Sequence, residues 1–148
     1  GVIDLISARE YTQMTQISVS EIEYSDHLTF KPGTTGQIIL NAMTEKQMTE
    51  AYIVNDDQLL LGKINVLSLV EDRENYMEKM EKSPVTLSSD NALTEAIEIA
   101  SNFVGESIPI VEEKKLVGAI TEGDLFTKVL ALEDDLRNEE TEYAAANK

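Results

Sequence analysis

The feature that most constrains the fold is an internal repeat. The segment LTFKPGTTGQIILNAMTEKQMTEAYIVNDDQLLLGKINVLSLV begins at Leu28, and it aligns with VTLSSDNALTEAIEIASNFVGESIPIVEEKKLVGAITEGDLF, which begins at Val85. After one gap in a turn, Gly62 meets Gly118. Each copy is too small to bury its own apolar face, so the repeat predicts two copies of one supersecondary unit packed on each other.

The second copy is the clearer guide to the elements of this unit. Some of its segments have the apolar pattern of a strand and others have apolar residues at helical spacing. Polar or glycine-containing stretches separate these segments. The pattern predicts a short strand over 84–87, a helix over 93–104 that ends at Gly105, a hairpin from 107–111 and 116–120, and a closing helix from Thr121 to about Leu132. The first copy gives the same β-α-β-β-α order, so we expect an α+β fold.

The composition narrows the function. The chain of 148 residues has 42% hydrophobic residues, no cysteine and one histidine, and its net charge of −16 disfavours nucleic acid as a partner. No apolar run is long enough to insert into a membrane. We find no phosphate-binding loop, no nucleophile beside a base and no metal-ligand cluster, so we expect neither catalytic nor metal-binding residues.

The stretch GAITEGDL, residues 118–125, carries the main candidate site. Thr121 and Asp124 have the spacing of a helix cap, in which the threonine accepts a bond from a free backbone N–H and the aspartate favours the positive helix start. In the first copy Asn65 stands where Thr121 stands, and Ser68 stands where Asp124 stands. Because asparagine or threonine alone can cap a helix, capping does not require the Asp124 carboxylate.

These residues resemble a tandem pair of CBS domains, also called a Bateman module. The resemblance covers about residues 18–132, and its most specific part is SIPIVEEKKLVGAITEGDL at 107–125. It implies two β-α-β-β-α units related by a pseudo-twofold axis, with sheets facing across a central cleft, and a homodimer. The implied boundaries are 1–17 for a connector, 18–81 for the first CBS unit, 82–132 for the second and 133–148 for an acidic tail.

The resemblance also implies a nucleotide site. In that family the aspartate of a Gly-x-x-Thr-x-x-Asp pattern holds the ribose of an adenosine ligand, which here implies Asp124 with Thr121 beside it. The adenine would lie among residues of the first and second strands, here Val85, Thr86, Ser107, Ile108 and Pro109. Regulatory ligands would be AMP, ADP, ATP or S-adenosylmethionine, and no cofactor is required. The negative net charge of the chain favours ligands with few phosphate groups. Four lysines could bind a phosphate, but they also fit as ordinary surface charges: Lys63, Lys82, Lys114 and Lys115.

Residues 1–22 resemble the connector that precedes the CBS pair in bacterial ClC-type chloride channels and antiporters. The similarity rests on Ile3, Asp4, Leu5, Arg9, Glu10 and Val19. It implies a regulatory domain on the cytoplasmic side of the cell membrane, whose partner is the membrane domain of a chloride transporter. Three alternatives stay open: an N-terminal arm that packs on the pair, a structural dimerisation module with vestigial sites, and a regulatory domain of another transporter or enzyme.

Overall fold

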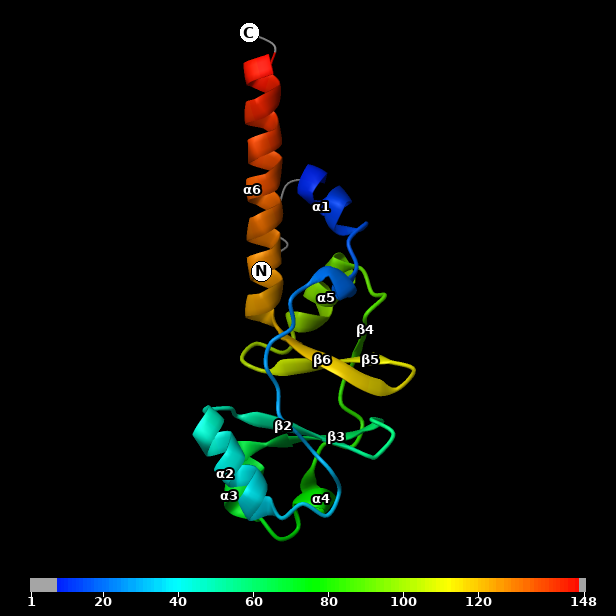
Figure 1. Cartoon of the computed structure of the whole chain (residues 1–148), viewed down its shortest axis with the longest axis vertical. Coiled ribbons are helices and arrows are strands. Elements are labelled where there is room, and N and C mark those ends of the chain that lie inside the picture. The colour runs from blue at the N-terminus through cyan, green and yellow to red at the C-terminus, as the bar shows by residue number, and fades with distance from the viewer. Residues whose placement is uncertain (1–7, 147–148) are drawn as a thin grey trace.

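The computed structural model describes residues 8–146, and the side chains of these except residues 10 and 140–146. Two units lie one above the other, and a long C-terminal helix projects away from them (Figure 1). The first unit comprises β1 (Thr29–Phe30), α2 (Gly36–Lys46), β2 (Glu50–Val54), β3 (Leu60–Asn65) and α3 (Val66–Glu71), followed by the short α4 (Tyr76–Lys79). The second comprises β4 (Leu87–Ser88), α5 (Leu93–Ala100), β5 (Ser107–Glu112), β6 (Lys115–Thr121) and α6 (Glu122–Ala146). The β-α-β-β-α order therefore occurs twice, as the repeat predicts.

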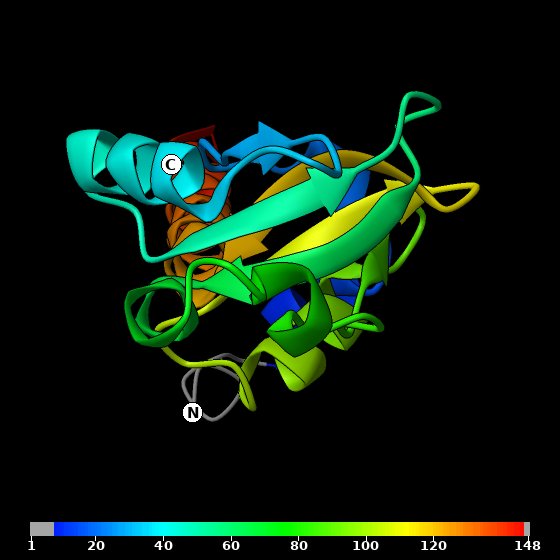
Figure 2. The same ribbon diagram turned by 90° about the horizontal axis from the view of Figure 1, so that it is seen from below.

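The two sheets have the same topology and register. Each has three strands in the order first, second, third, with a parallel pair and then an antiparallel pair. Ile53 of β2 pairs with Gly62, and its counterpart Ile110 of β5 pairs with Gly118. A register shift follows both isoleucines. The sequence alignment of the two copies is thus confirmed strand by strand, and the α+β fold with two facing sheets is observed (Figure 2).

The segment before each unit crosses onto the other unit. Ser25 forms a bridge with Ala119 of β6, and Glu81 forms the corresponding bridge with Lys63 of β3. The glycines of the repeat make room for these crossings. A Cβ atom at Gly118 would collide with the ring of Tyr24, and one at Gly62 would approach the Met80 sulfur. The crossings therefore add backbone hydrogen bonds between the two units to the packing of the sheets.

The N-terminal arm belongs to the second unit. The helix α1 (Ala8–Met14) lies beside α6 (Figure 1), and a 3-10 helix follows at Val19–Glu21. Met14, Val19 and Ile22 are buried in the same core as β4, β5 and β6. Packing on the pair is therefore the observed state of the arm from residue 8 onward. Ile3, Asp4 and Leu5, on which the connector resemblance partly depends, lie outside the described residues.

The predicted strand over 84–87 is wrong, because the strand begins only at Leu87. In the first unit Tyr52 donates its N–H to the carbonyl oxygen of Leu28 at 2.9 Å. The counterpart of Tyr52 is Pro109, which has no N–H to donate. The missing bond leaves Val85 and Thr86 outside the sheet, where both are exposed.

Two helix ends also differ from the prediction. The helix α5 ends at Ala100 rather than Val104, and Gly105, with φ +80°, belongs to the turn that follows it. The closing helix does not end near Leu132 but continues to Ala146. Glutamate, alanine and leucine favour helix, and neither glycine nor proline interrupts this segment. None of the helices in residues 8–146 combines the length and the apolar character needed to cross a membrane.

Candidate functional site

The start of α6 is a reciprocal helix cap. The backbone N–H of Thr121 donates to Asp124 Oδ2 at 2.8 Å, and the N–H of Asp124 donates to Thr121 Oγ1 at 3.2 Å. The predicted capping role of this pair is confirmed. In the first unit Asn65 Oδ1 accepts the N–H of Leu67 at 2.8 Å, so that helix is capped without a carboxylate. The cap alone therefore does not explain why the second unit carries Asp124.

A residue from the opposite unit's leading segment also binds this carboxylate. The Ser25 hydroxyl donates to Asp124 Oδ2 at 2.5 Å, and the Ser25 N–H donates to the Ala119 carbonyl oxygen at 3.0 Å. Ser25 is half-buried. A ribose hydroxyl that approached the same carboxylate oxygen would compete with a hydroxyl of the protein itself.

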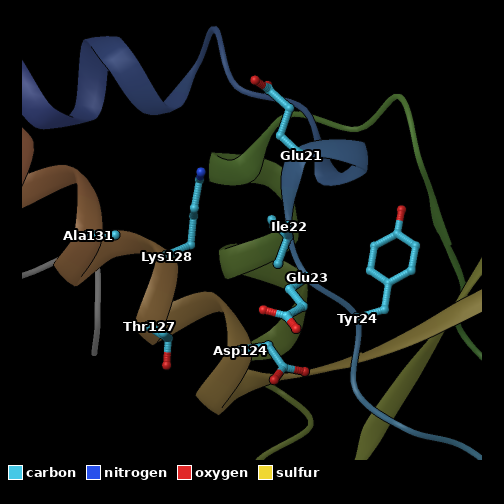
Figure 3. A pocket seen from close by; sticks show the side chains of 8 residues that line it. All are labelled: Glu21, Ile22, Glu23, Tyr24, Asp124, Thr127, Lys128 and Ala131. Carbon is cyan, nitrogen blue, oxygen red and sulfur yellow. The ribbon is translucent and has the colours of Figure 1, made fainter.

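The residues just before Ser25 line one cavity, and the residues just after it line another. The larger, of about 420 Å³, lies between the start of α6 and the segment that precedes Ser25 (Figure 3). Its lining residues are Glu21, Ile22, Glu23, Tyr24, Asp124, Thr127, Lys128 and Ala131. The smaller, of about 200 Å³, has Asp26 and His27 in its wall together with Thr121. Because Thr121 and Asp124 are bonded to each other, the cap of α6 forms part of both cavities. Thr121 also lines a third cavity, of about 470 Å³, together with Glu122 and Phe126.

The smaller cavity lies at the contact between the two units. Tyr52 and Glu50 of the first unit face Ser107 of the second. The Ser107 N–H and hydroxyl donate to Glu50 Oε1 at 2.7 and 2.8 Å, and the Tyr52 and Ser107 hydroxyl oxygens lie 2.5 Å apart. Burial, with the neighbouring Glu50 carboxylate, raises the pKa of Tyr52, so its phenol stays protonated at neutral pH. At about 200 Å³ the cavity is smaller than the roughly 300–1,000 Å³ of typical ligand pockets.

The equivalent space in the first unit is reduced by an ion pair. A cavity of about 130 Å³ there includes Asn65 and Ser68, the counterparts of the α6 cap residues. The Lys63 ammonium binds Glu50 Oε2 at 2.6 Å and donates to the Ser107 carbonyl oxygen at 2.8 Å. The side chains of Lys63 and Glu50 are only 7% and 9% exposed. The protein thus places its own cation where the second unit has Ala119, the counterpart of Lys63 in the repeat.

The structure brings together only part of the predicted nucleotide-binding set. Ser107 and Thr121 line the smaller cavity, and Asp124 lines the larger one. Ile108 and Pro109 are buried in β5, while Val85 and Thr86 line neither cavity. As a binding set, these residues stay a prediction.

Sequence reasoning missed the contribution of the first unit to this site. Asp26, His27, Glu50 and Tyr52 all face Thr121 across the smaller cavity. The available signal was the pair of repeat glycines, which mark where another chain segment crosses the strand. No group of three or more histidine, cysteine or acidic side chains in residues 8–146 is placed to hold a metal ion.

Comparisons with known proteins agree with this fold. The CBS domain family matches residues 70–131. The structure of CBSX2 in complex with AMP superposes with a TM-score of 0.66 at 20% identity, covering 78% of this chain and 98% of that one. The CBS domain pair of protein MJ0100, in complex with 5′-methylthioadenosine and S-adenosyl-L-methionine, gives a TM-score of 0.62 at 16% identity, covering 78% and 96%. The chain folds as a CBS-domain pair.

The curated relatives of this chain are longer proteins. Uncharacterized protein MJ1232 of Methanocaldococcus jannaschii is 25% identical over 82% of this chain and 43% of its own length. Homoserine O-acetyltransferase of Methanohalobium evestigatum is 26% identical over 72% of this chain and 23% of its own. The chain thus spans less than half the length of the curated relatives it matches.

Proposed function

We propose that this CBS pair is a regulatory, non-catalytic module that binds an adenosine-type ligand at the start of α6. The observation that carries the proposal is the bonded pair of Thr121 and Asp124, which lines the cavities at the start of α6, one of them at the contact between the units. A carboxylate there can accept hydrogen bonds from both vicinal hydroxyls of a ribose. The similar structures solved in complex with AMP, or with 5′-methylthioadenosine and S-adenosyl-L-methionine, support the same ligand class.

Ligand entry requires the chain around Ser25 to move. Of the two cavities beside Ser25, one is lined by Asp124 and the other by Thr121, but neither is lined by both. The Ser25 hydroxyl, in the segment between the two cavities, is bonded to the Asp124 carboxylate. Ribose binding would replace the Ser25 bond and join the two spaces. The segment that moves connects directly to the buried residues Val19 and Ile22, so the change would reach α1.

Regulation would follow from this coupling. A ligand that binds only the opened arrangement shifts the population toward it, by no more than its differential affinity for the two arrangements. The relatives support a modular role, because one segment recurs in longer proteins whose names give different activities, such as homoserine O-acetyltransferase and A-adding tRNA nucleotidyltransferase. The chloride-transporter host, its membrane-domain partner, the cytoplasmic location and the homodimer stay predictions within this proposal.

The test compares the two halves of the repeat. Asp124→Ala should abolish the binding of AMP and S-adenosylmethionine in calorimetric titrations, while Ser68→Ala at the equivalent position should leave it unchanged. Circular dichroism and thermal unfolding check that both variants remain folded. If no adenosine compound binds to the wild-type chain, the structural dimerisation alternative replaces the proposal.

A further inference from the structure

The larger cavity has an uneven set of charges around Asp124. Glu21, Glu23 and Asp124 face a single cation, Lys128. Glu21 is engaged by the backbone N–H of Ser18 at 2.9 Å. In the part of the chain that the structure describes, neither Glu23 nor Lys128 has a hydrogen-bond or ion-pair partner. Two opposite charges in one cavity are therefore free to meet a ligand.

These two charges lie on opposite walls. Glu23 belongs to the segment before Ser25 and is turned toward the start of α6, whereas Lys128 reaches from α6 toward the 3-10 helix (Figure 3). Lys128 is one helical turn beyond Asp124, so both project from the same side of α6. A ligand group that carries both an ammonium and a carboxylate would find a partner for each.

A 5′-phosphate would meet the opposite situation. With its ribose at Asp124, the phosphate would add negative charge beside the Glu23 and Asp124 carboxylates, with Lys128 as the only counterion in this lining. Lys63, the other cation nearby, is already bound to Glu50 and lies 3.5 Å from Glu106. Like charges that share one cavity weaken binding, and the net charge of −16 adds a repulsive background.

We propose that the site selects an adenosine whose 5′ group is cationic and carries an amino acid, of the S-adenosylmethionine type, over one that carries a 5′-phosphate. This selectivity rests on the proposed function. Glu23 is the selectivity residue: it binds the ammonium or faces the sulfonium and repels phosphate. Lys128 binds the ligand carboxylate.

The experiment titrates four compounds into the full chain by calorimetry. They are S-adenosylmethionine, S-adenosylhomocysteine, which keeps the amino acid but lacks the sulfonium charge, 5′-methylthioadenosine and AMP. We expect affinity to fall in that order. Glu23→Gln should weaken S-adenosylmethionine binding about five-fold, as removal of one partially exposed charge contact does, and should strengthen AMP binding.

The matched control is Glu45→Gln, which makes the same change in net charge at an exposed position of α2. It should leave the ratio of the affinities for S-adenosylmethionine and AMP unchanged. Should AMP bind the wild type as tightly as S-adenosylmethionine, or should Glu23→Gln and Glu45→Gln behave alike, the selectivity is overturned. The proposed function still stands in that case, provided that Asp124→Ala abolishes binding; if no compound binds, both fail together.

Discussion

The two halves of this chain share the repeated unit of the CBS-pair fold and differ in what occupies the space under the closing helix. In the first half the Lys63 ammonium lies there, bound to Glu50 and to a carbonyl oxygen of the second half. In the second half the position of Lys63 is Ala119, and three cavities lie beside the start of α6. The repeated pattern of apolar residues and glycines determines the backbone, whereas a few polar side chains decide which half has room for a ligand.

The strongest way to break this asymmetry is to remove the internal cation. Lys63→Met would leave the Glu50 carboxylate buried without its counterion, which destabilises a protein by about 3–5 kcal/mol. We expect the free energy of unfolding, measured by urea denaturation, to fall by an amount in this range. A fall below about 1 kcal/mol would show that the Ser107 donors alone satisfy Glu50.

Two controls separate the charge from the packing. The double variant Glu50→Gln/Lys63→Met removes both charges and should recover most of the lost stability, because a neutral pair carries little desolvation penalty. Lys82→Met removes an exposed lysine and should change the free energy of unfolding by about 0.5 kcal/mol or less.

A second difference concerns the glycines under the crossing segments. A methyl group at Gly118 would meet the ring of Tyr24, whereas one at Gly62 would meet mainly the flexible end of Met80. Gly118→Ala should therefore destabilise the chain by about 1–3 kcal/mol, the usual range for overpacking, and Gly62→Ala should cost less. Thermal unfolding of the two variants side by side gives the order, and the reverse order would contradict the crossing geometry as its cause.

The sequence predicted the fold well because the fold depends on patterns. The register of the two copies, the hairpins and the capped closing helices all follow from periodic apolar residues and from residues with a defined local role, such as Asn65 and Thr121. The strand predicted over 84–87 was misplaced because Pro109 disrupts its pairing with Thr86, 23 residues earlier in the chain. The local pattern of residues 84–87 contains no sign of this distant proline.

The site was predicted less well because its contacts join residues distant in the sequence. Ser25 reaches Asp124 across 99 residues, and Glu50 reaches Ser107 across 57. Lys63 looked like a surface charge, since a lysine in a strand gives no sign of the buried carboxylate that it meets on the neighbouring strand β2. The predicted adenine contacts all come from the second copy, whereas the segment that leads into the first unit crosses onto the second.

The hydroxyl contact between the units offers a smaller change with a pH signature. Tyr52→Phe removes the bond to Ser107 and should cost about 1 kcal/mol at neutral pH. Burial raises the pKa of Tyr52 above its ordinary value, so above about pH 10 the unfolded chain releases a proton that the folded chain retains. The free energy of unfolding of the wild type should therefore decline as the pH rises through this range.

In Tyr52→Phe this decline should be shallower, because one contributing group is gone. The pKa values of Tyr24 and Tyr76 are also raised by burial, so some decline should remain. Urea denaturation at intervals from pH 8 to about pH 11 measures both slopes. Equal slopes in the wild type and the variant would contradict the buried, protonated state of Tyr52.

The smallest expected effect tests why the two sheets begin differently. Pro109→Val would restore the N–H that Tyr52 supplies in the first half, at nearly constant side-chain volume, so the segment at Val85 could pair with β5 as Leu28 pairs with β2. The gain of one backbone hydrogen bond and the loss of proline's rigidity oppose each other, and the net change should be about 0.5 kcal/mol or less. Stability alone cannot report this change, but hydrogen exchange can: the new amide at position 109 should be protected, whereas one introduced by Pro84→Val, outside any strand, should exchange freely. An unprotected amide at position 109 would mean that another contact, and not the proline, keeps Val85 and Thr86 out of the sheet.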